Sequence, residues 1–181
     1  MVQSLLQCRE GLGRAVTHTT RAPRPGERNG VDYHFVSPDE FARLDAQGVF
    51  LEQATIYGNR YGTSRREAES RLAAGEDVVL VIDWQGARSV RAKLAGDSDL
   101  RLFTVFLMPP SLRVLERRLA GRGSEDAQQL QRRLGAAREE MAHAPEFDVC
   151  LVNDCLETCV AQLSAWIDQA KAGDLPRVPC P

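Results

Sequence analysis

Lysine is scarce in this sequence, a strong net charge is absent, and no apolar run is long enough to cross a bilayer. The 181 residues carry a formal net charge of −2, so no overall field attracts the chain to nucleic acid or to an anionic membrane surface. A membrane-spanning helix needs about 20 consecutive apolar residues, and the apolar runs here are far shorter. We therefore expect a protein without nucleic-acid or membrane partners, in which any anion is held by local groups.

Cysteine is sparse and forms no metal-binding pattern. The five cysteines are odd in number, and the first residues form a charged amphipathic stretch that is unlike a secretory signal. Cys155 and Cys159 are one helical turn apart, but no CxxC pair or nearby histidine completes a four-ligand zinc site. We expect buried or half-buried thiols, no metal held by the protein, and a cytoplasmic location.

Arginine supplies nearly all of the positive charge. Of the 23 basic residues, only Lys93 and Lys171 are lysines. The planar guanidinium group of arginine suits phosphate and carboxylate groups. A bias in genomic composition would produce the same excess, so the position of each arginine along the chain decides its significance.

The apolar pattern predicts an α/β fold, in which helices flank a parallel sheet. Nearly continuous apolar runs predict buried parallel strands at residues 78–82, 102–107 and 149–152. The segments that alternate with them predict helices at 64–74, 85–94, 111–119, 125–143 and 155–171. Between residues 17 and 60 the pattern changes to short strands, at 33–36 and 49–56, and to a helix capped by Ser37 with an acidic residue to close a capping box.

The stretch from Thr17 to Tyr33 holds the densest set of candidate anion-binding groups. Its sequence, THTTRAPRPGERNGVDY, places hydroxyls and arginines on a turn-forming backbone. Arg21 and Arg24 are spaced so that two guanidinium groups could hold one phosphate, with the Tyr33 hydroxyl as a third donor. A solvated basic loop is the alternative interpretation of the same residues.

With the two residues that follow, this stretch resembles the GMP-binding signature of the guanylate kinase family almost position for position. Further motifs follow in the family's order, namely FLE at 50–52, GNRYGT at 58–63, IDWQG at 82–86, and PPS at 109–111 through RG at 122–123. The resemblance implies a P-loop-NTPase-like core (residues 1–16 and 75–181), a β-rich GMP-binding insert (17–74) and a helical lid (about 117–137). It also implies phosphoryl transfer from ATP, with Mg²⁺, to GMP or dGMP, giving GDP and ADP.

By this resemblance, the acceptor site has two parts. The phosphate clamp comprises Arg21, Arg24, Tyr33 and Tyr61, and the base readers are Thr17, Glu52 and Thr63. Guanine presents N1–H and the N2 amino group as adjacent donors, and one carboxylate can accept from both, whereas adenine offers no such pair. The alternatives are an outward position on a half-exposed strand for Glu52 and a hydroxyl at a helix start for Thr63.

The resemblance also implies roles for residues farther along the chain. Asp83 follows a strand, where a carboxylate could hold a magnesium-bound water or contact the GMP base. The family commonly carries another acid two residues earlier, where this chain has Val81, and we expect weaker affinity or selectivity if that acid contributes. The resemblance further assigns the charge-stabilising lid arginines to Arg118, Arg122 and Arg133, and the contact with the adenine of ATP to Asn153.

A phosphate-binding P-loop motif is missing from the sequence. Such a loop requires Gly-Lys-[Ser/Thr] between a strand and a helix, and no Gly-Lys pair is present. Neither Lys93 nor Lys171 lies in such a turn, and residues 1–7 resemble the helix that follows the family's P-loop. We hypothesise that a longer protein begins upstream. Four or five buried side chains of a missing strand would be worth roughly 10 kcal/mol, so we expect a weakened fold.

A binding module is the alternative function. A non-catalytic guanylate-kinase-like domain would hold a protein or phosphopeptide and would not need a P-loop. The three lid arginines argue against this alternative, because a binding module needs no transition-state clamp. The sequence does not indicate an oligomeric state.

Overall fold

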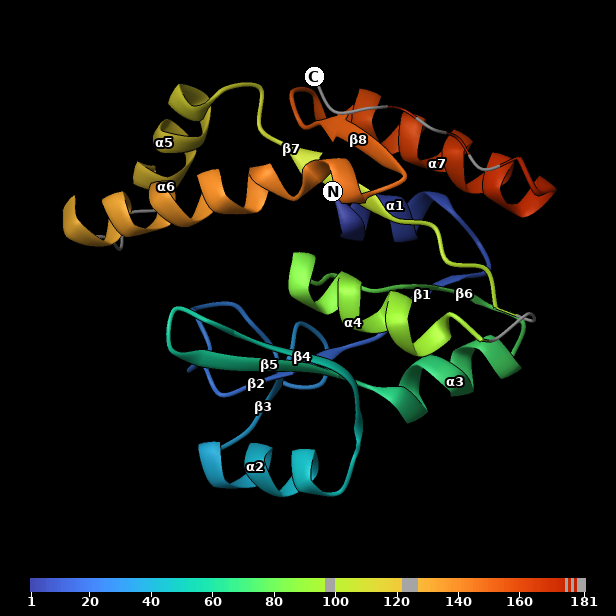
Figure 1. Cartoon of the computed structure of the whole chain (residues 1–181), viewed down its shortest axis with the longest axis horizontal. Coiled ribbons are helices and arrows are strands. Elements are labelled where there is room, and N and C mark those ends of the chain that lie inside the picture. Colours follow the sequence, from blue (N-terminus) through green and yellow to red (C-terminus); the bar gives the residue numbers. More distant parts are fainter. Residues whose placement is uncertain (97–99, 122–126, 175, 177, 179–181) are drawn as a thin grey trace. The chain divides into compact units, whose positions relative to one another are not determined.

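The computed structural model describes residues 1–96, 100–121, 127–174, 176 and 178 (Figure 1). The chain forms two compact units. The first unit is Leu6–Leu102, and the second unit combines Met1–Leu5 with Phe103–Pro181. Helix α1 (Val2–Cys8) spans the junction between these two ranges. The expected division into core, GMP-binding insert and lid concerns function and stays a prediction.

The first unit is built around a four-stranded sheet with the strand order β3-β2-β5-β4. Its strands are β2 (Thr17–Thr19), β3 (His34–Phe35), β4 (Phe50–Ile56) and β5 (Asn59–Ser64). Strand β5 is antiparallel to both β2 and β4, whereas β3 runs parallel to β2. A separate parallel pair is formed by β1 (Leu12–Arg14) and β6 (Asp77–Val79). Three helices complete the unit, α2 (Pro38–Ala46), α3 (Arg65–Ala73) and α4 (Trp84–Leu94).

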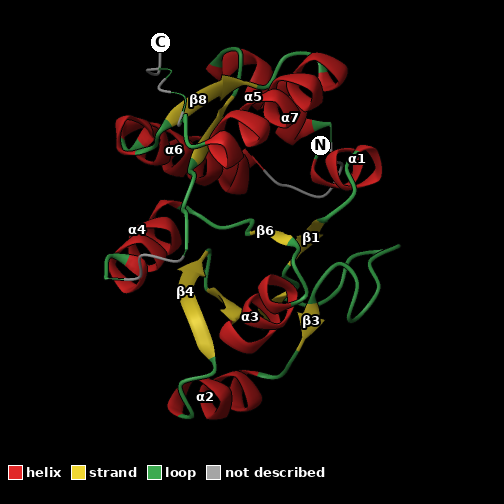
Figure 2. Ribbon diagram, turned by 90° about the vertical axis from the view of Figure 1, so that its right-hand side faces the viewer, coloured by secondary structure: helices red, strands yellow, loops and turns green. Residues whose placement is uncertain are grey.

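The second unit contains a parallel pair of strands among helices (Figure 2). Its elements are β7 (Val105–Met108), α5 (Leu112–Ala120), α6 (Ala127–Ala142), a 3₁₀ turn (Ala144–Glu146), β8 (Val149–Val152) and α7 (Leu156–Ala172). Just before the two strands, Asp148 Oδ2 accepts hydrogen bonds from the backbone N and the hydroxyl of Thr104 at 2.8 and 2.7 Å. Helix α7 buries Cys159, Leu163 and Trp166.

Side chains at the helix starts explain where several helices begin. Ser37 Oγ accepts from the backbone N of Glu40 at 3.1 Å, and Pro38 occupies the first position of α2. The Glu40 carboxylate pairs with Arg43, so the predicted N-cap is confirmed while no described hydrogen bond closes the second half of the capping box. Asp83 caps α4 in the same way, accepting from the backbone N of Gly86 at 2.8 Å.

The hairpin between β4 and β5 turns at Tyr57 and Gly58. Both residues have positive φ, 50° and 78°, as a tight two-residue hairpin turn requires. The core behind this hairpin contains Phe41, which is fully buried and stacks on Phe50 with ring centroids 4.5 Å apart. A Cβ at Gly62 would lie 2.9 Å from the Phe50 ring, so glycine lets the ring pack against β5.

The α/β class and the predicted helices are confirmed, with shifts of one residue at most of their ends. The predicted start of the 125–143 helix, at residues 125–126, lies outside the described residues. The strand predicted at 78–82 is shorter, because β1 offers only three residues and pairs with 77–79. The strand predicted at 102–107 begins only at Val105, since Thr104 bonds to the Asp148 side chain. The three predicted parallel strands belong to two separate pairs, β1–β6 and β7–β8, and do not form a single sheet among the described residues.

The cysteines near the C-terminus differ in their surroundings. Cys159 is a buried thiol as expected, whereas Cys155 is exposed and the buried Cys150 is disulfide-bonded, which corrects the expectation of buried or half-buried thiols at these positions. Within the described part of the chain, no helix combines the length and apolar character needed to span a membrane.

Candidate functional site

The three predicted base readers lie on adjacent strands of the four-stranded sheet. Thr17 on β2 pairs with Thr63 on β5, and Thr63 in turn pairs with Glu52 on β4. Their exposed fractions are only 3% for Thr17, 0% for Thr63 and 2% for Glu52. The structure therefore brings together three polar residues that are far apart in the sequence, and it excludes the alternative that Glu52 points outward.

Each of these three side chains has one buried oxygen atom without a hydrogen-bond partner among the described residues. The three atoms are Thr17 Oγ1, Glu52 Oε1 and Thr63 Oγ1. An unsatisfied buried polar group costs about 1–3 kcal/mol, and native proteins contain few of them. Three such atoms on neighbouring strands are expected where a polar ligand supplies the missing hydrogen bonds.

The environment of Glu52 disfavours its charged form. Burial raises the pKa of the Glu52 carboxyl, and the negative charge of Asp83 adds to this effect, whereas contacts with Thr63 and the positive charge of Lys93 act in the opposite direction. A ligand that donates two hydrogen bonds would relieve this cost by stabilising the carboxylate.

Helix α4 approaches Glu52 closely at its first turn. A Cβ atom added at Gly86 would lie 2.7 Å from Glu52 Oε2 and 3.4 Å from Asp83 Oδ1. Asp83 therefore lies close to Glu52, and its Oδ1 atom caps the helix. Val81, where the family commonly has an acid, is 47% exposed.

Arg21 of the phosphate clamp is held by an internal carboxylate. Its Nη2 atom donates to both carboxylate oxygens of Glu27, at 2.8 and 3.0 Å, and its Nη1 atom donates to the carbonyl of Ala22 at 2.7 Å. The Arg21 backbone N donates to Thr19 Oγ1 at 3.1 Å. The pKa of Glu27 is lowered, mainly by its hydrogen bond with Arg21.

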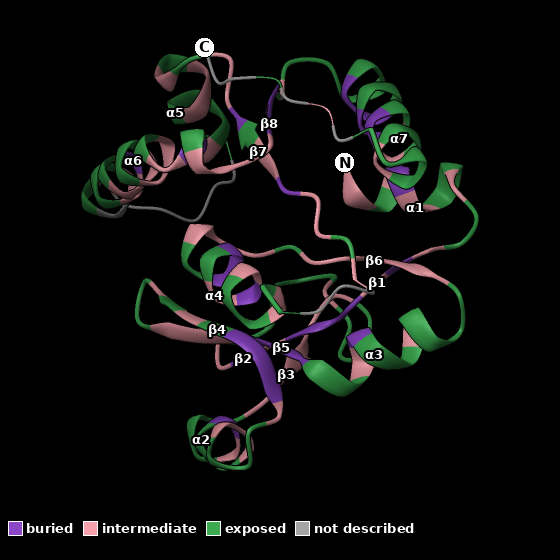
Figure 3. Ribbon diagram, turned by 45° about the vertical axis from the view of Figure 1, so that its right-hand side comes forward, coloured by how far each residue is buried: buried purple, intermediate pink, exposed green. Residues whose placement is uncertain are grey.

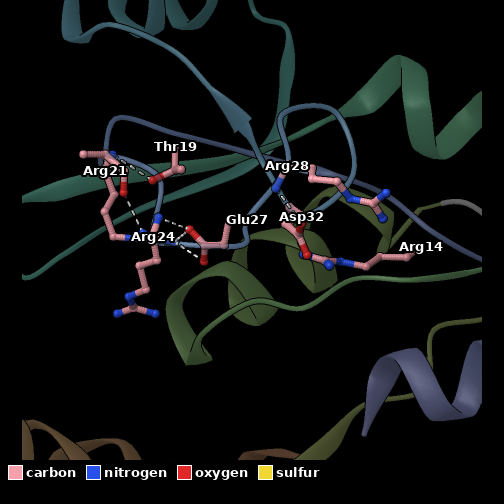
Figure 4. Close-up of polar contacts among 8 residues, drawn as sticks. Arg14, Thr19, Arg21, Arg24, Glu27, Arg28 and Asp32 are labelled. Atoms are coloured by element: carbon pink, nitrogen blue, oxygen red, sulfur yellow. Dashed lines mark hydrogen bonds and ion pairs between the residues drawn. The ribbon is translucent and has the colours of Figure 1, made fainter. Parts of the chain in front are cut away.

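The other members of the phosphate clamp surround this ion pair. The Arg21 guanidinium lies over the Tyr33 ring at 5.3 Å, and the rings of Tyr33 and Tyr61 are 6.2 Å apart. The backbone N of Arg24 donates to Glu27 Oε2 at 2.7 Å, and the exposed Arg24 guanidinium extends away from that carboxylate (Figure 4). The clamp therefore combines one ordered guanidinium, two phenol rings and one guanidinium that reaches into solvent.

The lid arginines and Asn153 belong to the second unit. The guanidinium of Arg118 donates to the backbone carbonyls of Asn153 at 2.8 Å and Asp154 at 3.4 Å. This contact brings a predicted catalytic residue to the predicted adenine-binding loop. Arg133 lies on α6 and is partly buried, and Arg122 lies outside the described residues.

Glu27 contacts two residues of the predicted phosphate clamp, and it was not among the residues predicted from the sequence. It lies within the arginine-rich stretch, and an acid three residues after Arg24 was the available signal. The described residues include no group of three or more His, Cys, Asp or Glu side chains that could hold a metal ion. Asp83 is a single carboxylate engaged in capping, so the described residues do not fit a Mg²⁺ ion held by the protein alone.

Known proteins resemble this chain over most of its length. Residues 1–170 match the guanylate kinase family. The chain is 47% identical over 165 residues to a guanylate kinase from Alkalilimnicola ehrlichii, covering 91% of this chain and 79% of that protein. It is 44% identical over 178 residues to one from Chromohalobacter salexigens, covering 98% and 80% of the two chains. The crystal structure of guanylate kinase from Anaplasma phagocytophilum superposes with a TM-score of 0.77 at 34% identity, over 94% of this chain and 79% of that one. This chain therefore belongs to the guanylate kinase family.

Proposed function

We propose that this protein transfers a phosphoryl group from ATP to GMP in the cytoplasm. In this reaction a phosphate oxygen of GMP bonds to the γ-phosphorus of ATP, and the bond between that phosphorus and the leaving ADP breaks. The relatives that it matches are guanylate kinases. The observation that carries the choice of acceptor is the set of three buried, unpartnered polar atoms on Thr17, Glu52 and Thr63.

Guanine fits the chemistry of these base readers. An ionised Glu52 accepts from N1–H and the N2 amino group, while the two threonine hydroxyls can donate to the ring nitrogens or to O6. Adenine has no pair of adjacent donors on that edge, so it would leave the buried carboxylate unpaired. A site built to accept hydrogen bonds from both donors of guanine strongly rejects adenine, which lacks that pair of donors.

The phosphate clamp supports binding of the GMP phosphate. The Arg21 guanidinium uses one nitrogen for Glu27 and another for a carbonyl, and it also interacts with the Tyr61 hydroxyl, so both side chains can donate to one phosphate oxygen. Arg24 contributes a second positive charge from solvent, and Tyr33 and Tyr61 contribute hydroxyl donors. Phosphate contacts of this kind position the acceptor oxygen for transfer.

The donor side of the reaction depends on the second unit. We propose that Arg118, Arg122 and Arg133 stabilise the charge that develops on the transferring phosphoryl group. Asn153 would contact the adenine of ATP. Mg²⁺ would arrive bound to the ATP phosphates, where it neutralises their charge. The sequence holds no Gly-Lys pair for the β- and γ-phosphates, so we expect slow turnover from the 181-residue chain.

Calorimetry tests the acceptor site directly. We expect the purified chain to bind GMP and to bind AMP at least 100-fold more weakly, since a buried, unpaired polar group costs about 1–3 kcal/mol and a charged one costs more. Glu52→Ala and Arg21→Ala should each abolish measurable GMP binding. Glu69→Ala is the control, because Glu69 is an exposed carboxylate on α3 in the same unit.

Equal binding of GMP and AMP would refute the proposal. GMP binding that survives Glu52→Ala would also argue against it, and would favour a module that holds only a phosphate group. The transfer step is tested by measuring, with chromatography, the GDP formed from GMP and ATP. Arg118→Ala should then reduce kcat more than it changes the KM for GMP.

A further inference from the structure

Strand β4 is irregular at the residue that precedes Glu52. Phe50 pairs with Ser64 and Glu52 pairs with Thr63, so the register shifts between them and Leu51 has no partner in the ladder. Phe50, Leu51 and Glu52 are all buried, whereas a regular strand with one solvent-facing side alternates buried and exposed residues. A β-bulge redirects side chains in this way. The orientation of Glu52 therefore depends on this bulge.

The ammonium group of Lys93 binds the carbonyls of the bulge. Lys93 Nζ donates to the carbonyl O of Leu51 at 2.6 Å and lies 3.5 Å from that of Phe50. The bulge removes Leu51 from the strand ladder, and this charged donor satisfies its carbonyl instead. Hydrogen bonds that involve a charged group are stronger than neutral ones.

Helix α4 places Lys93 on the same face as two other residues that contact β4. Gly86, Val90 and Lys93 follow one another at spacings of four and three residues, so they share one face of the helix. Gly86 adjoins the Glu52 carboxylate, and Val90 is 1% exposed in a core cluster that includes Leu51. Figure 3 shows α4 beside the buried part of β4. The helix therefore contacts both the backbone and the side chain that form the base-reading site.

We propose that Lys93 is a positioning residue for guanine recognition, which fixes the β4 bulge so that the Glu52 carboxylate points toward the base. This inference rests on the proposed function, because it assumes that Glu52 reads guanine. Lys93 does not touch the nucleotide in this proposal. Its contacts with β4 are to the carbonyls of Phe50 and Leu51.

The simpler role for Lys93 is general stabilisation, since a lysine in the last turn of a helix interacts favourably with the helix dipole. Lys171 offers a matched control for this effect. It is exposed and lies in the last turn of α7, in the second unit. Lys171→Met therefore removes the same charge from the same helix position without touching β4.

The test compares binding of GMP and of IMP, whose base lacks the 2-amino group that Glu52 would accept from. We expect the wild type to prefer GMP, and Lys93→Met to reduce the ratio of the two affinities by roughly tenfold, an effect of the size of one hydrogen bond to a charged group. Lys93→Arg should restore part of the preference, and Lys171→Met should leave it unchanged. In a Glu52→Gln background, Lys93→Met should have no further effect on the ratio.

An unchanged ratio in Lys93→Met, with or without a lower melting temperature, would overturn the positioning role and leave Lys93 a stabilising residue only. A further fall in the ratio when Lys93→Met is added to Glu52→Gln would also overturn it, because Lys93 would then act independently of Glu52. A wild type that binds GMP and IMP equally would instead refute base reading by Glu52, and with it the proposed acceptor.

Discussion

The Glu27 carboxylate holds the guanidinium of Arg21, with both carboxylate oxygens within 3.0 Å of the same nitrogen. The side chains of Arg21 and Glu27 are only 15% and 19% exposed, so this ion pair is less screened than a surface pair. A negative group thus lies next to the place where the phosphate of a nucleotide is expected. We interpret Glu27 as the residue that orders the phosphate clamp before the nucleotide binds.

This relationship predicts the effect of changing Glu27. Glu27→Ala should weaken GMP binding by roughly tenfold, because Arg21 and the backbone of Arg24 both lose an acceptor worth about 1–2 kcal/mol. Glu27→Gln keeps an acceptor oxygen and should weaken binding less. Calorimetry with GMP and with guanosine separates the two halves of the site. Guanosine binding should not change, and a loss of guanosine affinity would contradict this role.

The buried carboxylate of Glu52 predicts a conflict between stability and binding. Because the pKa of Glu52 is raised in the folded state, the unfolded chain ionises first as the pH rises above about 4.5. Stability is then lost until the pH passes the folded pKa. Glu52→Gln should therefore be more stable than wild type at pH 7.5, by about 1 kcal/mol, while losing GMP selectivity.

Urea unfolding at two pH values measures this effect. The stability difference between Glu52→Gln and wild type should nearly disappear at pH 4, where the carboxyl is protonated in both states. A Glu52→Gln variant that is less stable than wild type at pH 7.5 would show that the carboxylate contributes favourably to the fold.

Gly86→Ala is a second substitution that we expect to affect GMP binding and stability differently. Alanine is favoured over glycine within a helix by about 1 kcal/mol, but its Cβ would lie 2.7 Å from Glu52 Oε2 and 3.1 Å from the Cβ of Ile82. Gly86→Ala should therefore weaken GMP binding by tenfold or more with little loss of melting temperature. Gly135→Ala on α6 is the control, since nothing lies within 4 Å of its added Cβ. Equal GMP affinity in both variants would contradict the close approach.

His18 on strand β2 predicts a loss of stability in mild acid. Burial lowers the pKa of His18, and the nearby His34, whose ring centroid lies at 4.5 Å, lowers it further, while Glu67 and Glu40 oppose the shift. As the pH falls below about 6.5, the unfolded chain binds a proton first, so the folded state loses stability until the pH reaches the folded pKa.

Unfolding curves between pH 7.5 and 5.5 test this expectation. His18→Gln should show a smaller loss of stability over this range than wild type. His143→Gln, in the second unit, is the control. It should keep the loss of stability between the two pH values that His18 causes in the wild type. A His18→Gln variant with the same pH dependence as wild type would show that His18 does not contribute.

Much of the fold could be predicted from the sequence because its signals are local. The apolar runs and the cap at Ser37 identify elements from residues close together in the chain, whereas the capping role of Asp83 was not predicted. Strands β1, β2 and β5 were not predicted. Strand β2 consists of Thr-His-Thr, and β5 carries polar residues and a glycine, so neither shows an apolar pattern. They become strands through pairing with distant segments, and pairing partners are not encoded in local composition.

Residue type and spacing are enough to predict the α/β class, the positions of most helices, the guanylate kinase motifs and the candidate residues. The burial of Thr17, Glu52 and Thr63 on neighbouring strands, each with one oxygen that has no partner among the described residues, follows only from the three-dimensional fold. The fold also decides that Glu27 holds Arg21 and that Lys93 binds the β4 bulge. The physical reason is that burial and hydrogen bonding depend on which distant segments pack against each other, and a single chain's residue order does not state those contacts.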